Sequence, residues 1–127
     1  MKRMIYVSLM INVVVLIPVC LGLIFDAAWV FNGYGPASPA RAILLSIYGA
    51  ILLVSFGLLF KPMPLLVASL LLVQVIYKLI SPFAVGNIFN PVVISNILVA
   101  LVHLFTLYLI YKAVLSDDSV RTTLGFE

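Results

Sequence analysis

The sequence predicts an all-α integral membrane protein, built as one antiparallel bundle of four transmembrane helices. Hydrophobic residues make up 65% of its 127 residues and charged residues only 9%, whereas soluble domains have about a quarter of their residues charged. The hydrophobic residues gather in four runs, each close to the roughly 20 residues that a helix needs to cross the hydrocarbon core. Helix is the expected structure of such runs, because lipid satisfies no backbone polar group.

The first run, residues 4–25, is expected to be a retained helix. It follows Lys2 and Arg3, as the core of a cleaved signal peptide would. However, it is longer than the roughly 7–15 residues of such a core, and Asn12 interrupts it.

The second predicted helix covers residues 41–60. Before it lies the longest connection, residues 26–41, in which glycine and proline predict turns rather than helix. Aromatic residues typical of a membrane–water interface lie in this connection: Trp29, Phe31 and Tyr34. A tight turn at Lys61–Pro64 leads out of the second helix.

The third predicted helix covers residues 63–80 and ends near Lys78, whose long side chain can reach outward to water. A second turn-rich connection, residues 81–91, follows it.

The fourth predicted helix covers residues 91–112. Pro91 suits its first turn, where no intrahelical donor is lost, and Asn90 suits the N-cap. Residues 113–127 are expected to form a short cytoplasmic tail. The whole chain, residues 1–127, is thus predicted to be a single domain.

The positive charges predict the orientation of the bundle. With both termini in the cytoplasm, the inner side holds five cations: Lys2, Arg3, Lys61, Lys112 and Arg121. The outer side then holds two: Arg41 and Lys78. Because cytoplasmic loops carry the excess of Lys and Arg, both the N- and the C-terminus are predicted to be inside.

Polar side chains recur on these predicted helices in pairs that share one helix face. The pairs, four or seven residues apart, are Arg41 with Tyr48, Gln74 with Lys78, and Asn96 with His103. At about 1.5 Å per residue, Asn96 lies about 7 Å and His103 about 18 Å from the outer end of their helix. Tyr48 and Gln74 fall at depths near that of Asn96.

We therefore expect a polar cluster in the outer half of the bundle, because lipid offers these side chains no hydrogen bonds. It would contain Tyr48, Gln74, Asn96 and His103, with Arg41 and Lys78 at its mouth. One interpretation is a pocket for the head of a quinone or a lipid. The other is structural: these side chains hydrogen-bond between helices and fix their packing.

The sequence lacks the residues that several kinds of active site require. His103 is the single histidine, so one chain cannot hold a bis-histidine haem. His103 could either contact a ligand or be a neutral histidine packed between helices. There is no metal-binding motif and no Ser-His-acid set. Asp26 is expected to form an ion pair at the rim, with Arg41 or Lys78. With no basic run, nucleic acid is not an expected partner.

Proton-coupled drug export is also not expected. No predicted span holds an acidic residue in its middle, whereas small four-helix multidrug transporters use a membrane-embedded glutamate. Together these features favour a non-enzymatic protein.

Two stretches resemble the DoxX-like group of small bacterial four-helix proteins. They are 39-PARAILLSIYGAILLVSFGLLFKP-62 and 68-ASLLLVQVIYKLISPFAVG-86, an arginine-led second helix and a third helix with a polar end. The resemblance implies a four-helix protein of the bacterial cytoplasmic (inner) membrane, in some cases associated with quinone-linked redox systems. No catalytic residue carries over from it.

The leading functional hypothesis is a small non-enzymatic membrane protein that binds a quinone or a lipid in the outer-leaflet cluster. The alternative is an accessory subunit that packs against other membrane protein subunits in a larger complex. A homo-oligomeric channel or transporter needs a polar path across the whole membrane, and the inner half offers few residues for it: Ser8, Asn12, Ser55 and Thr106.

Overall fold

The computed structural model describes residues 1–116, and within them every regular element is a helix. The helices are α1 (Lys2–Phe25), α2 (Ala28–Tyr34), α3 (Pro39–Phe60), α4 (Pro64–Val85) and α5 (Pro91–Ser116). Four of them, α1, α3, α4 and α5, are long and apolar enough to cross a membrane. The predicted all-α protein with four transmembrane helices is therefore confirmed. Most of the predicted tail, residues 117–127, lies outside the described residues.

The starts of the helices follow from local chemistry. Ser38 caps α3 by accepting a hydrogen bond from the backbone N–H of Arg41 at 3.1 Å. Asn90 caps α5 in the same way, since its Oδ1 accepts from the backbone N–H of Val92 at 2.8 Å. A proline follows each of these caps, in the first turn where its missing N–H costs nothing. The predicted cap at Asn90 is confirmed.

Helix α4 runs five residues beyond its predicted end at residue 80 and includes Pro82. A proline inside a helix leaves the carbonyl four residues earlier, here that of Lys78, without its usual donor. The Ser81 hydroxyl donates to this carbonyl at 2.6 Å and replaces the lost bond. The helix then ends at Gly86, which has φ +72°, a conformation that glycine adopts without strain.

The connection predicted as a loop at residues 26–41 contains a helix instead, α2. Glycine at two contact points lets this short helix lie close to its neighbours. A Cβ at Gly22 of α1 would overlap the ring of Trp29, and a Cβ at Gly33 would overlap Val92 of α5. The turn prediction was wrong here because packing against other helices, which has no signal in the local sequence, stabilises α2.

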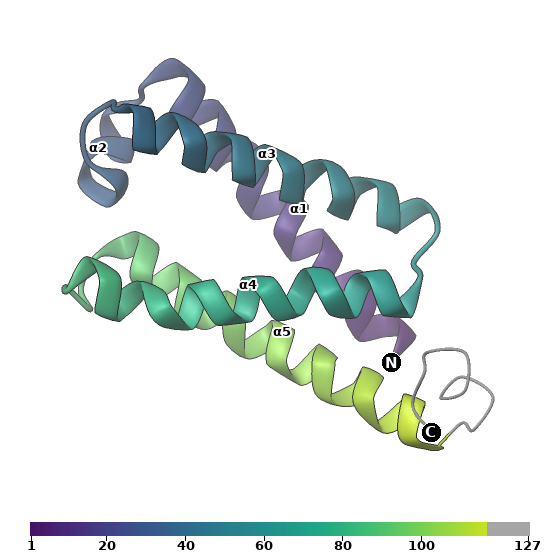
Figure 1. Ribbon diagram of the computed structural model, residues 1–127. Helices are drawn as coiled ribbons and strands as arrows, with labels where there is room; N and C mark the ends of the chain where they lie inside the picture. The colour runs from purple at the N-terminus through teal and green to yellow at the C-terminus, as the bar shows by residue number, and fades with distance from the viewer. Residues whose placement is uncertain (117–127) are drawn as a thin grey trace.

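The spanning helices form two pairs, α1 with α3 and α4 with α5, and α1 also contacts α5. Figure 1 shows α1 crossing from the side of α3 toward α4 and α5. Although a turn of three residues joins them, α3 and α4 pack against each other much less than each packs against its own partner. Both Lys2 and Ser116 lie at one end of the bundle, which we name the inner end; α2 and the α4–α5 turn mark the outer end (Figure 1).

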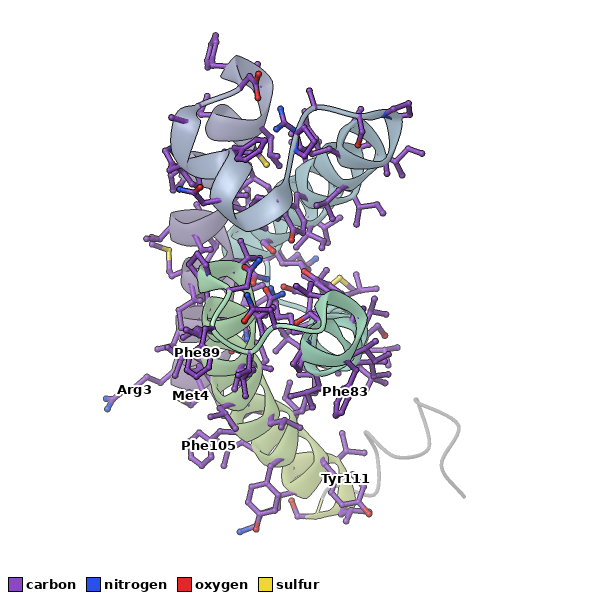
Figure 2. The ribbon with its side chains drawn as sticks, turned by 90° about the vertical axis from the view of Figure 1, so that its left-hand side faces the viewer. Arg3, Met4, Phe83, Phe89, Phe105 and Tyr111 are labelled. Atoms are coloured by element: carbon purple, nitrogen blue, oxygen red, sulfur yellow. The ribbon has the colours of Figure 1, made fainter. Side chains whose placement is uncertain are left out.

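Two hydrophobic clusters fill the bundle, one toward each end. The inner cluster contains Ile5, Leu9, Leu58, Val67, Leu71, Ile110 and Val114. The outer cluster contains Leu16, Cys20, Leu23, Val30, Tyr48 and Ile51. Large apolar side chains also cover the outside, such as Phe83 and Phe105, which project away from the helices in Figure 2. An apolar exterior around a partly polar interior is the arrangement that lipid requires.

Candidate functional site

A cavity of about 180 Å³ lies at the outer end, between α1 and α5 and beneath α2. We name it the outer cavity. Its lining residues are Val15, Leu16, Val19, Trp29, Gly33, Tyr34, Tyr48, Lys78, Pro91, Val92, Ser95 and Asn96. All five helices contribute, so the cavity exists only in the folded bundle.

Three polar residues of the cavity lining are buried. Tyr48, Lys78 and Asn96 are 4%, 5% and 7% exposed. The Lys78 ammonium donates to Asn96 Oδ1 at 3.2 Å, and Asn96 Nδ2 donates to the Ser81 hydroxyl at 3.2 Å. The ammonium also lies 5.0 Å from the centre of the Tyr77 ring, a favourable cation–π distance. We call Tyr48, Lys78 and Asn96 the floor of the cavity.

Lys78 has no acidic partner within residues 1–116. Asp26 is the one acidic residue in that part of the chain, and it forms an ion pair with Arg41 at 2.6 Å. An ammonium withdrawn from water without a counter-charge costs several kcal/mol, and it has three hydrogens to donate. The protein's described hydrogen bonds use one of these hydrogens, for Asn96.

Two further tyrosines, Tyr34 and Tyr77, lie beside this floor. The Tyr34 hydroxyl donates to the Tyr48 hydroxyl at 3.5 Å, and their rings meet edge to face at 6.0 Å. Burial raises the pKa of Tyr34, so this residue of α2 stays a neutral donor. The Tyr77 hydroxyl is buried and has no hydrogen-bond partner among the described residues. Among the tyrosines that line the cavity, the hydroxyl hydrogen of Tyr48 is therefore the one without an acceptor in the described contacts.

Helix α2 is the roof of the cavity and supplies Trp29, Gly33 and Tyr34. Asn90, at the start of α5, donates to the carbonyl of Gly33 at 3.1 Å and ties the roof to that helix. The rim between α1 and α5 is apolar, with Val15, Val19 and Val92 partly exposed. The rim is thus apolar, whereas the charged and buried polar groups lie at the floor.

A second polar cluster, the His103 network, lies deeper and joins α1, α3 and α5. It contains Ser8, Asn12, Ser55, His103 and Thr106, all buried. Asn12 Oδ1 lies 2.9 Å from His103 Nε2, and the Ser8 hydroxyl lies 3.1 Å from Nδ1. Since an amide oxygen only accepts, Nε2 carries the ring proton and Nδ1 accepts from Ser8.

The rest of the network completes these bonds. Asn12 Nδ2 donates to the Ser55 hydroxyl at 3.0 Å, and the hydroxyls of Ser8 and Thr106 lie 2.7 Å apart. Both ring nitrogens of His103 are thus satisfied by the protein, which is the arrangement of a neutral packed histidine that stabilises helix packing.

The six residues predicted for the site fall in four places. Tyr48, Lys78 and Asn96 line the outer cavity. Gln74 is 1% exposed, and its amide donates to the carbonyl of Leu70 in its own helix at 3.4 Å. His103 belongs to the deeper network. Arg41 forms the expected rim ion pair with Asp26, and its guanidinium also donates to the carbonyl of Gly35 at 3.0 Å.

Lys78 was expected at the mouth but lies on the floor. The difference follows from α4, which continues seven residues past Lys78 to Val85 and so places it about 10 Å inside the helix end. The lining contributed by Trp29 and Tyr34 was not predicted as part of the site. Their aromatic character was the available signal, but it indicated only an interface location.

No protein-family model matches this chain, and neither do the curated proteins or the solved structures compared with it. The resemblance to DoxX-like proteins therefore stays a prediction.

Proposed function

We propose that this integral membrane protein binds an amphipathic molecule, a lipid or a quinone, whose polar head occupies the outer cavity. Lys78, Asn96 and Tyr48 contact the head, and the tail leaves over the apolar rim into the bilayer. In keeping with the resemblance to DoxX-like proteins, we place it in the bacterial cytoplasmic membrane. The role is one of binding rather than catalysis.

The observation that carries this proposal is the buried ammonium of Lys78 in a cavity between helices. A charged side chain inside a membrane helix is costly and usually marks a binding site or a pathway. A purely structural lysine would need its remaining hydrogens satisfied, and among the described contacts only Asn96 accepts one. A ligand head that accepts hydrogen bonds would supply what is missing.

The size and shape of the cavity agree with a head rather than a whole ligand. Pockets for complete small molecules measure about 300–1,000 Å³, which is more than the roughly 180 Å³ of this cavity. The remainder of the molecule must then lie outside, along Val15, Val19 and Val92. A long apolar tail is the chemistry that suits such a path through lipid.

The second candidate is an accessory subunit of a larger membrane complex. The limited packing between α3 and α4 favours it, because each helix leaves a broad apolar face uncovered. Exposed side chains on these faces include Leu53, Phe56, Leu72 and Ile76. Another transmembrane helix could cover them, and the DoxX-like resemblance is compatible with either role.

Native mass spectrometry of the full chain in lipid nanodiscs tests the proposal. We expect a stoichiometric small-molecule mass on the wild-type protein. Lys78→Met should lower the affinity by about tenfold to a hundredfold, since a hydrogen bond to a charged group is worth about 1.5–3 kcal/mol.

Lys112→Met is the matched control, because Lys112 also lies beside a tyrosine ring, that of Tyr108, but is exposed. It should retain the bound molecule. Equal occupancy in both variants would refute the proposed role of Lys78. A co-purifying protein without a small molecule would favour the accessory subunit.

A further inference from the structure

We infer that the outer cavity selects an amphiphile with an anionic head, a carboxylate or a phosphate, over a neutral one. This inference rests on the proposed function and names the class of ligand. The observations behind it are the balance of donors and acceptors at the floor, the uncompensated charge of Lys78, and the helix end that lines the cavity.

The floor of the cavity has a surplus of donors. Each of its two acceptor atoms already accepts one hydrogen bond, Asn96 Oδ1 from Lys78 and the Tyr48 oxygen from Tyr34. Two hydrogens of the ammonium and the hydroxyl hydrogen of Tyr48 have no acceptor in the described contacts. Tyr77, whose ring lies beside the ammonium but not on the cavity lining, has a buried hydroxyl that also lacks a partner among the described residues. What this site lacks is a group with several acceptor atoms and few or no donors, which describes a carboxylate or a phosphate.

Charge is the property that distinguishes an anionic head from a quinone at this site. The carbonyl oxygens of a quinone could accept these hydrogen bonds, but they would leave the Lys78 charge uncompensated. Within residues 1–116 the one carboxylate is that of Asp26, and Arg41 already occupies it. A carboxylate or phosphate would satisfy the same donors and also neutralise the ammonium in a low-dielectric site, where opposite charges attract strongly.

The start of α5 adds to this preference. Pro91, Val92 and Ser95 lie in the first turns of a helix of 26 residues and line the cavity. The N–H groups of Val92 and Val93 already donate to Asn90, but the positive end of the helix dipole still favours negative charge beside it. Lys78 and this helix end thus both contribute positive electrostatic potential to the cavity.

Trp29 offers a direct measurement. It is the single tryptophan of the protein and lies on the lining of the cavity, so bromine atoms on a bound chain will quench its fluorescence. We would titrate the full-length protein in uncharged-lipid nanodiscs with a brominated fatty acid and with the fatty alcohol of the same chain. Only the saturable quenching that the unbrominated compound displaces counts as binding.

We expect the acid to bind at least tenfold more tightly than the alcohol. Lys78→Met should abolish this ratio, Lys78→Arg should keep most of it, and the control Lys112→Met should leave it unchanged. If Lys78→Met fails to fold, as judged by circular dichroism, the ratio measured on the wild-type protein still decides the question.

Further arms separate the sources of the anion and the possible failures. Phosphatidic acid measured against diacylglycerol shows whether a lipid phosphate is preferred in the same way, and either acid series would support the inference. Displacement by inorganic phosphate alone would overturn it in favour of a free anion. Equal binding of acid and alcohol would overturn the anionic preference but leave the proposed function intact. The absence of any saturable quenching would overturn both.

Discussion

Replacing His103 with leucine removes the two hydrogen bonds at the centre of the His103 network and keeps a side chain of similar size. The imidazole contacts Asn12 at 2.9 Å and Ser8 at 3.1 Å, and these three side chains are at most 3% exposed. Interhelical hydrogen bonds in membranes average about 0.6 kcal/mol and reach about 1–2 kcal/mol. Two such bonds predict a loss of about 1–3 kcal/mol in the free energy of unfolding.

The assay is reversible unfolding in mixed detergent micelles, followed by far-ultraviolet circular dichroism. Tyr108→Phe removes a hydroxyl from a side chain that is 55% exposed, so it should leave the free energy of unfolding unchanged. A double-mutant cycle between His103 and Asn12 should give a coupling energy above about 0.5 kcal/mol, as contacting residues do. His103→Leu within about 0.3 kcal/mol of the wild type, or additive effects in the cycle, would refute a stabilising role for the network.

Three further predictions use the same assay. Gly33→Ala places a methyl group against α5 and should lower the free energy of unfolding by about 1–3 kcal/mol. In the control Gly49→Ala the methyl group points into open space, so this change within a helix should raise the free energy of unfolding by about 0.5–1 kcal/mol. Equal effects would contradict the close packing of the roof. Ser81→Ala leaves a carbonyl of α4 and an amide of α5 without their partner and should cost about 1–2 kcal/mol, whereas Ser69→Ala, an exposed position, should be nearly neutral. Asp26→Asn breaks the ion pair at the rim but should lower the free energy of unfolding by less than about 1 kcal/mol, because the Asp26 side chain is 66% exposed. A larger loss would show that this pair stabilises the outer end.

The sequence predicts the four spanning helices well because hydropathy is a local property. Each run carries its own evidence, whatever it packs against. The ends of the helices depend on more distant or less common contacts. The Ser81 hydroxyl, which sits beside the proline, keeps α4 helical past Pro82, and the close contacts of Gly22 and Gly33 stabilise α2.

The candidate site was predicted in part for a related reason. The rule that polar side chains face the interior identified Tyr48, Asn96 and His103 as buried. Which of them meet depends on how the helices pair, and that pairing has no signature in one sequence. His103 lies with Ser8 and Asn12 because α5 crosses α1 there, whereas Asn96 lies with Lys78 because α4 and α5 form a pair.

The pairing of the helices divides the chain into two structural halves. Each pair is continuous in sequence, one ending at Phe60 and the other beginning at Pro64, and the turn between them carries no buried contact of the core clusters. The two halves contact each other through the inner cluster, the His103 network and the packing of α2 on α5, not through the peptide link. The molecule is therefore organised as two helical hairpins within one polypeptide, which associate as two separate proteins of a heterodimer would. The outer cavity lies between these two hairpins.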